Sequence, residues 1–244
     1  MNLNSVYLKK NVITSIFIIL FIILFIILIF LIFFKKEFFN ISIKKPTFHI
    51  LIATAGRPSL INLLNSLKNE LKKNDAITIV FDGNDAKKKS EISNFLFNEH
   101  KSYINVIEQI PNLGYWGHGI RNMYQDILKP ECTFIMHADD DDEYIQGSFN
   151  KLRQKCIDPN TLYFSKMIKF YKSGEFKIIP NNNQIIMTNI GTPNGIIPTL
   201  ISRNGKWGYH YGGDYAYYNE LKDFALKIVF LDEVIYKVNE NNNV

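Results

Sequence analysis

Short apolar runs alternate with segments of helical period from residue 47 onward, and this alternation limits the possible folds most. Residues 47–53, TFHILIA, form the first run, and a Gly-Arg-Pro turn follows it. Apolar side chains at positions 60, 61, 63, 64, 67 and 71 then have the spacing of an amphipathic helix. Further apolar runs cover residues 76–83, 104–110 and 132–138. Strands and helices that alternate at this length predict an α/β domain with a mainly parallel central sheet.

The remaining segments of this domain are assigned from the same patterns. A polar helix is expected around residues 86–99 and a short helix at residues 123–128. Residues 162–187 contain three strand-like pieces, LYFSKMIKFY, FKIIP and QIIM, which are typical of antiparallel strands. The stretch GTPNGIIP is expected to be a loop because it is rich in Gly and Pro. A helix at about 214–225 and a final strand complete a single domain at residues 47–238.

Residues 12–34 form a separate apolar run in which only Thr14 and Ser15 are polar. At about 1.5 Å per residue the run reaches roughly 35 Å, enough to cross a bilayer. A cleaved signal peptide is the alternative, but its apolar core usually has about 7–15 residues and ends at a small-residue site. We therefore expect one transmembrane helix, a single-pass signal anchor. A tail at residues 1–11 would precede it, and a juxtamembrane linker at residues 35–46 would follow; residues 239–244 are expected to be a disordered tail.

The lysines around this run bear on topology and on partners. Two lysines precede the run and four follow it closely: Lys9 and Lys10, then Lys35, Lys36, Lys44 and Lys45. This small difference favours a cytoplasmic domain by the positive-inside rule, and the side of the membrane stays open. The net charge of +5 comes partly from these lysines, so it favours an anionic membrane surface or substrate. No Lys/Arg-rich run is interleaved with aromatic residues, which argues against a nucleic-acid partner.

Four consecutive aspartates, residues 139–142, follow the apolar run at 132–138. Carboxylates at positions i and i+2 of an extended segment project to the same face, so two of them can hold one divalent cation. Asp82 ends an earlier strand at the same carboxyl edge, where open parallel sheets bind their ligands. A calcium loop that began at Asp139 would need glycine at its sixth position, which is Tyr144. A solvated acidic turn is the alternative to a Mg²⁺ or Mn²⁺ site.

Several other kinds of catalytic motif do not occur in the sequence. The glycine stretch GYWGHG does not match G-x-G-x-x-G, and no Walker sequence is present. The five histidines lack zinc-ligand spacing, and a serine hydrolase would need a G-x-S-x-G turn. The sequence therefore argues against dinucleotide-binding, P-loop, zinc and serine hydrolase chemistry.

Six stretches occur in a fixed order and span nearly all of residues 47–238: IATAGRPSLINLLNSL, IVFDGND, PNLGYWGHGIRNMYQD, FIMHADDDDEY, GGDYAYY and KIVFLDEVIYKVN. In this order they resemble the nucleotide-sugar glycosyltransferases of the GT-A (Rossmann-like) fold, especially the family 2 type. The matching family patterns include P-T-x-x-R-P, D-G-S-x-D, N-x-G-x-x-x-A-R-N-x-G, D-x-D-D and G-E-D. The chain departs from them at Ala53, Ile120 and Gly213, where the patterns have proline, alanine and glutamate. HADDDD, GTPNG and GGDY also resemble enzymes of large DNA viruses of algae and protists.

The resemblance implies a role for each matching residue. Eight residues would bind the nucleotide-sugar: Thr54, Ala55, Arg57, Asp82, Arg121, Asn122, Asp139 and Asp140. Asp141 and Asp142 would bind the metal. Asp214 would be the catalytic base that accepts the proton of the acceptor hydroxyl. Asp82 would accept from the uracil edge, and Asp139 would contact the ribose. Asp139 and Asp141 align with D-x-D, and Asp142 aligns with the aspartate after it. In the alternative register, Asp140 and Asp142 align with D-x-D. Helix capping is the alternative role for Asp214.

The implied function is that of a membrane-anchored, metal-dependent glycosyltransferase, a hexosyl- or related transferase of the EC 2.4 type. With Mn²⁺ or Mg²⁺ it would move a sugar from a nucleotide-sugar donor, expected to be a UDP-sugar, to a glycan or glycoconjugate acceptor with inversion. Two other classes stay open, a sugar-nucleotide nucleotidyltransferase and a non-catalytic glycan- or ion-binding membrane protein. The nucleotidyltransferases normally carry a glycine-rich phosphate loop with basic residues, of which IATAGRPS is a poor version.

Overall fold

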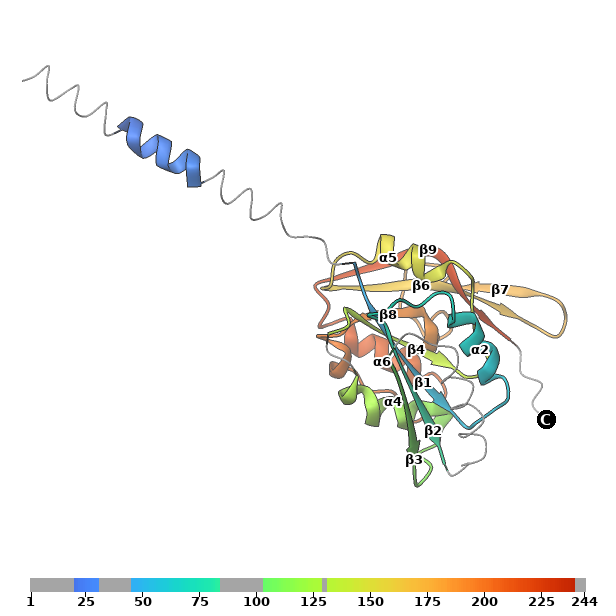
Figure 1. Ribbon diagram of the computed structural model, residues 1–244. Coiled ribbons are helices and arrows are strands. Elements are labelled where there is room, and N and C mark those ends of the chain that lie inside the picture. Colours follow the sequence, from blue (N-terminus) through green and yellow to red (C-terminus); the bar gives the residue numbers. More distant parts are fainter. Residues whose placement is uncertain (1–19, 31–44, 84–102, 129–130, 240–244) are drawn as a thin grey trace, which may run out of the picture. The chain divides into compact units, whose positions relative to one another are not determined.

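The computed structural model describes residues 20–30, 45–83, 103–128 and 131–239 (Figure 1). The chain divides into two compact units, Met1–Lys44 and Lys45–Val244. In the first unit, residues 20–30 are helical. Among the described residues, no helix has both the length and the apolar character needed to cross a bilayer. The rest of the predicted anchor, most of the linker, the polar helix predicted at 86–99 and the tail after Asn239 lie outside the described residues.

The second unit is built on one sheet, to which the described residues contribute nine strands. They are β1 (Phe48–Thr54), β2 (Ala76–Asp82), β3 (Tyr103–Gln109), β4 (Phe134–Asp139), β5 (Glu143–Tyr144), β6 (Thr161–Phe170), β7 (Phe176–Ile179), β8 (Gly195–Pro198) and β9 (Lys227–Val238). Their order is β3-β2-β1-β4-β8-β6-β9-β5, and β7 pairs with β6. The strands β3, β2, β1 and β4 are parallel, whereas β8 is antiparallel to both β4 and β6. The predicted α/β class is confirmed, and the sheet is mixed outside its first four strands.

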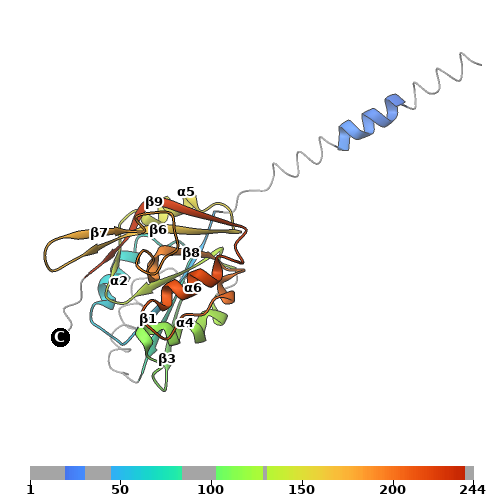
Figure 2. The same ribbon diagram turned by 180° about the vertical axis from the view of Figure 1, so that it is seen from behind.

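Helices cover both faces of this sheet (Figures 1 and 2). The helices α2 (Leu60–Leu67) and α5 (Ser148–Lys155) pack on one face, and α4 (His118–Tyr124) and α6 (Gly213–Leu221) pack on the other. The alternation along β1 explains the two cores, since Ile50 and Ile52 join the core under α2 while Leu51 joins the core under α4. Each such fully buried side chain stabilises the fold by about 2 kcal/mol.

The middle of the sheet differs from the prediction. The stretch expected to be a loop, residues 191–198, contains β8, and the strand expected at residues 184–187 is irregular. The buried side chain of Asn194 donates to the carbonyl oxygens of Ser165 (2.8 Å) and Ile179 (3.2 Å), which ties the segment to its neighbours. Gly195 lies so close to Tyr218 that a Cβ would come within 2.3 Å of its ring. These contacts, distant in sequence, override the local preference of Gly and Pro for a loop.

Three helices also differ from the prediction. The helix α4 begins at His118 inside the glycine stretch rather than at residue 123, because Gly117 supplies the left-handed turn (φ 80°) that starts it. The helix α6 ends at Leu221 instead of about residue 225. The helix α5 was not predicted, and its first turn is held from outside, since Glu70 accepts from the backbone N–H groups of Gly147 and Phe149.

Candidate active site

The carboxyl ends of β1, β2 and β4 meet at one edge of the sheet. Parallel register places Thr54 beside Phe81 and Ala53 beside Asp139. Asp82 ends β2 and Asp139 ends β4, so polar side chains from separate segments come together there. Ligands of open parallel sheets bind outside this edge. Adjoining cavities open at the same place.

A small cavity of about 180 Å³ lies over the ends of β1 and β2. Six of the eight residues predicted to bind the nucleotide-sugar line it: Thr54, Ala55, Arg57, Asp82, Asp139 and Asp140. The loop that carries Gly114 and Trp116 closes another side of this cavity. The structure therefore brings most of the predicted nucleotide residues to one pocket.

Asp82 shapes the loop over the small cavity. Its two carboxylate oxygens accept from the backbone N–H groups of Leu113 (2.6 Å) and Gly114 (2.8 Å). The side chain of Asn112 also donates to the Asp82 carbonyl oxygen (3.0 Å). A carboxylate has about four lone-pair sites, so each oxygen can still accept from a ligand.

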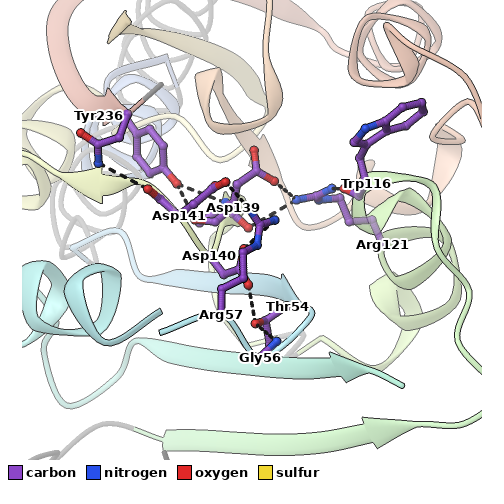
Figure 3. Close-up of polar contacts among 11 residues, drawn as sticks. Thr54, Gly56, Arg57, Trp116, Arg121, Asp139, Asp140, Asp141 and Tyr236 are labelled. Atoms are coloured by element: carbon purple, nitrogen blue, oxygen red, sulfur yellow. Dashed lines mark hydrogen bonds and ion pairs between the residues drawn. The ribbon is translucent and has the colours of Figure 1, made fainter. Parts of the chain in front are cut away.

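Arg57 and Thr54 hold two of the four aspartates (Figure 3). The Thr54 hydroxyl donates to Asp140, and one nitrogen of Arg57 lies 3.0 Å from the other oxygen of that carboxylate. The second terminal nitrogen of Arg57 pairs with Asp141. Burial raises the pKa of Asp140, and the contacts with Thr54 and Arg57 oppose this rise. Asp140 thus faces β1 and the small cavity, whereas Asp141 extends from the other side of the guanidinium.

Arg121 connects the glycine loop to β4 from beneath the site. Its side chain is fully buried, and its guanidinium donates to the carbonyl oxygens of Trp116 (2.9 Å) and Ala138 (3.3 Å) and pairs with Asp139. It also lies 5.0 Å from the centre of the Trp207 ring. Arg121 lines neither the small nor the large cavity, so it acts on the site by holding Asp139 and the loop in place.

The predicted residue Asn122 also points away from the cavities. Its side chain accepts from the backbone N–H of Trp207 and donates to the Trp207 carbonyl oxygen, both at 2.8 Å. This paired contact fastens α4 to the loop before α6. Asn122 can therefore affect a bound nucleotide only through the position of that loop.

A large cavity of about 700 Å³ continues from the small one. Three of the four aspartates, Asp139, Asp141 and Asp142, line it together with Asp214. Asp139 is held from both sides, because the Tyr236 hydroxyl accepts from its N–H (3.1 Å) and donates to its carbonyl oxygen (3.2 Å). The acidic run is thus divided, with Asp140 turned toward the small cavity and its neighbours toward the large one.

Asp141 and Asp142 are suited to bind a divalent cation, because both are carboxylates that line the large cavity. Burial, followed by the nearby charges of Asp139 and Asp141, raises the pKa of Asp142 to about 9. A carboxylate in this position gains most from a cation that offsets its charge. Among the described residues, no group of three or more His, Cys, Asp or Glu side chains converges on a metal position. Two carboxylates suffice where substrate phosphates and water supply the other ligands, as is usual for Mg²⁺.

Asp214 lies in the first turn of α6 and lines the large cavity. Gly212, with φ 86°, occupies the N-cap position, so Asp214 is not the capping residue; its carboxylate accepts from the next N–H, that of Tyr215 (2.8 Å). Burial raises the pKa of Asp214 above its ordinary value, with the charge of Asp139 adding to the rise. A partly buried carboxylate with a raised pKa is suited to accept a proton.

Gly213 explains one departure from the family pattern. A Cβ at this position would lie 2.1 Å from the Gly208 carbonyl oxygen and 2.5 Å from Nδ1 of His118. Any side chain would therefore displace the loop that precedes α6. The glutamate of the G-E-D pattern has no room here.

Several residues that line the large cavity are not among the predicted site residues: Trp116, His118, Lys169, Tyr171 and Tyr211. The Nδ1 of His118 donates to the Gly208 carbonyl oxygen (2.7 Å), which leaves Nε2 as an acceptor. Burial and the charge of Arg121 lower the pKa of His118, which favours this neutral form. The alternation of Lys169 and Tyr171 along one strand was a usable signal, but only the topology of β6 brings them here.

No protein-family model and no curated protein matches the sequence. Solved structures do match the fold. S. aureus TarS 1-349 aligns with a TM-score of 0.63 at 18% identity, over 79% of this chain and 60% of that chain. The same protein in complex with UDP-GlcNAc aligns with a TM-score of 0.63 at 18% identity, over 82% and 60% of the two chains.

A second protein shares the fold at lower identity. The mannosyltransferase PcManGT from Pyrobaculum calidifontis, in complex with GDP-Man and Mn²⁺, aligns with a TM-score of 0.60 at 10% identity, over 82% of this chain and 58% of that chain. This chain spans about three fifths of the length of the solved chains it matches. The likeness establishes that the chain has the fold of these nucleotide-sugar-bound proteins.

Proposed function

We propose that this chain is a GT-A glycosyltransferase that moves a sugar from a nucleotide-sugar, preferably a UDP-sugar, to a hydroxyl of a glycan or glycoconjugate. One observation carries the proposal. Asp139 joins a small cavity lined by Thr54, Arg57 and Asp82 to a large cavity lined by Asp214. A donor nucleoside and its sugar need two such compartments in continuity. The shared fold with UDP-GlcNAc-bound TarS and GDP-Man-bound PcManGT supports this function.

The nucleoside occupies the small cavity. Asp82 holds the loop at Leu113 and Gly114 and keeps lone pairs for the base edge. Asp139, fixed by Arg121 and Tyr236, lies where the ribose passes into the large cavity. Because these side chains are already oriented by the chain, little of the binding energy is lost in ordering them.

The diphosphate lies between the two cavities, near Arg57. Asp141 and Asp142 would hold Mn²⁺ or Mg²⁺, and the bound cation would offset the negative charge that develops on the diphosphate as the sugar–phosphate bond breaks. Arg57 pairs with Asp141 in this structure, and its side chain is 49% exposed. It is therefore free to turn toward a phosphate once a cation neutralises the carboxylate.

Asp214 takes the proton of the acceptor hydroxyl in the large cavity. That oxygen then attacks the anomeric carbon from the side opposite the departing diphosphate, so one displacement inverts the configuration. A positioned base of this kind typically contributes about 10²–10⁴-fold to the rate.

We also propose that residues 12–34 anchor the enzyme in a membrane as a single-pass protein. Their apolar length supports this, since the run contains no charged residue. The linker at residues 35–46 then joins the anchor to the catalytic domain.

Turnover of sugar nucleotides by the full chain in detergent tests the proposed function. UDP-, GDP- and TDP-sugars are incubated with Mn²⁺ or with a chelator, and the released nucleotide is measured with and without glycan acceptors. We expect release from one donor class that depends on the cation. Absence of turnover with all three classes would count against the function.

A further inference from the structure

Lysines of the hairpin formed by β6 and β7 line the cavities that Asp214 also lines. Lys169, on β6, lines the large cavity and also a side cavity of about 290 Å³, which Asp214 lines as well. Lys177, on β7, lines the side cavity and neither of the others. Figure 1 shows the hairpin of β6 and β7 that carries both lysines and extends beyond the rest of the sheet.

The two lysines face the same side of this hairpin. Lys169 lies directly opposite Lys177 in the antiparallel register, and Met167 lies opposite Ile179 two residues along each strand. Residues directly opposite each other project to one face, and so do residues i and i+2. Met167 and Ile179 also line the side cavity, which confirms that this face of the hairpin forms its wall.

A pair of like charges directly across two strands destabilises a hairpin. In the part of the chain that the structure describes, neither Lys169 nor Lys177 has a carboxylate within ion-pair distance. By contrast, Lys166 on the same strand pairs with Asp232 at 2.8 Å. The Nζ of Lys169 lies 5.7 Å from the centre of the Tyr171 ring, a contact that leaves the positive charge in place.

The position of the lysines favours the acceptor over the donor as their ligand. The donor's nucleoside and diphosphate are expected near Arg57, Trp116 and the small cavity. Neither Arg57 nor Trp116 lines the side cavity. Asp214, the proposed base, lines it together with Asp139 and Asp142, whereas Lys177 lines neither the small nor the large cavity. A group held by Lys177 therefore lies on the acceptor's side of the reacting bond.

We propose that the acceptor carries a negatively charged group, a phosphate or a carboxylate, and that Lys169 and Lys177 hold this group while Asp214 faces the hydroxyl to be glycosylated. The inference rests on the proposed function because it assigns the side cavity to the acceptor. The lysines offset the repulsion that Asp139, Asp142 and Asp214 exert on an anion in the same cavity. The lysines then select an acceptor by its negative charge, and Asp214 removes the proton from the hydroxyl of that acceptor.

Binding of matched probes to the full chain in detergent, saturated with UDP and Mn²⁺, tests the proposal. The probes are methyl glucoside, its 6-phosphate and methyl glucuronoside, and calorimetry measures each dissociation constant. We expect at least one charged probe to bind about tenfold more tightly than the neutral one, with an advantage that shrinks in high salt. The phosphate and glucuronoside arms identify which anion is preferred.

Variants of the lysine pair make the test specific. The double variant Lys169→Gln/Lys177→Gln should lose most of the advantage of the charged probe, by about tenfold, and Lys169→Arg/Lys177→Arg should keep it. Lys151→Gln, an exposed lysine on α5, is the matched control. The UDP affinity of each variant shows whether the lysines act on the donor instead.

Several outcomes would overturn the proposal. They are equal binding of the neutral and charged probes, no binding of either charged probe, retention of the charge preference by the double Gln variant, or an equally large loss of UDP affinity in that variant. Turnover of a sugar nucleotide by the wild-type chain is measured without any charged acceptor. Its failure would contradict the proposed function and is thus distinguishable from failure of this inference.

Discussion

The small and large cavities differ in how far the chain itself satisfies their polar groups. In the small cavity, Asp82 accepts two backbone N–H groups, and Asp140 has contacts with Thr54 and Arg57. In the large cavity, Asp142 and Asp214 each accept one backbone N–H, from Asn239 and Tyr215. Burial raises the pKa of both carboxyl groups, as it does for Asp140. The first pocket is completed by the protein, whereas the second needs a cation and an acceptor to complete it. Substitutions in the small cavity should therefore mainly weaken nucleotide binding, whereas substitutions in the large cavity should mainly lower the rate of sugar transfer or the affinity for the cation.

The largest effect is expected from Asp214→Asn, which removes the proposed base. We expect kcat to fall by about 10³-fold while the UDP affinity changes less than about twofold, because the base acts only on the acceptor. In the wild type, the raised pKa should place the acid limb of kcat above the range of an ordinary aspartate, with activity increasing as Asp214 loses its proton. Steady-state rates and UDP titrations check both, with Asp223→Asn as an exposed control near the end of α6.

The next effect distinguishes the two registers of the acidic run. Asp142→Asn should weaken Mn²⁺ binding in the presence of UDP by about 100-fold, because the variant loses a ligand charge in a buried position. Asp140→Asn should weaken it by less than about threefold, since Asp140 faces Thr54 and the small cavity. Calorimetry with Mn²⁺ measures both constants. Equal losses would favour the alternative register, in which Asp140 and Asp142 align with D-x-D.

A smaller effect is expected at the other end of the site. Asp82→Ala leaves the N–H groups of Leu113 and Gly114 without their acceptor, and each unsatisfied group costs about 1–3 kcal/mol when it is buried. We expect UDP to bind about tenfold more weakly and the melting temperature to fall by several degrees. Asp82→Asn keeps one acceptor oxygen and should lose less. Normal UDP affinity in Asp82→Ala would show that the loop does not contact the nucleotide.

The smallest expected effect concerns His137, in the core between β4 and α6. Both of its ring nitrogens lack a hydrogen-bond partner, and burial lowers its pKa well below the ordinary value. The native state thus cannot take up the proton that the unfolded state binds below about pH 6.5, so stability falls as the pH falls. About 1 kcal/mol should be lost between pH 6.5 and 5.5.

The variant His137→Leu should remove this loss, because leucine fills the site without a titrating group. Denaturant unfolding at several pH values measures the difference, and the exposed His210→Gln serves as the control. An unchanged pH dependence in His137→Leu would mean that other groups cause the loss.

The first half of the fold was more predictable than the second, for a physical reason. The strands β1, β2 and β4 are continuous apolar runs because the sheet is covered on both faces. The short strand β8 has no such pattern, since contacts of Asn194 and Gly195 with distant residues hold it in the sheet. Local signals cannot encode contacts between segments that are far apart in sequence.

The site residues show the same limit. Sequence order placed carboxylates at the strand ends, and the structure brings Asp82 and Asp139 to one cavity. The sequence could not indicate that Asn122 turns toward the Trp207 backbone, or that Asp140 and Asp141 pair with different nitrogens of Arg57. The sequence also could not indicate that Lys177 and Asp214 line one cavity, because this depends on how the hairpin of β6 and β7 packs in the folded domain.

A crystal structure of the protein with UDP and Mn²⁺ tests the division of the site most directly. The account predicts uridine in the small cavity beside Thr54 and Asp82, Mn²⁺ in contact with Asp141 or Asp142, and no contact between the nucleotide and Lys177. A diphosphate held by Lys169 and Lys177, or a nucleotide outside both cavities, would contradict it.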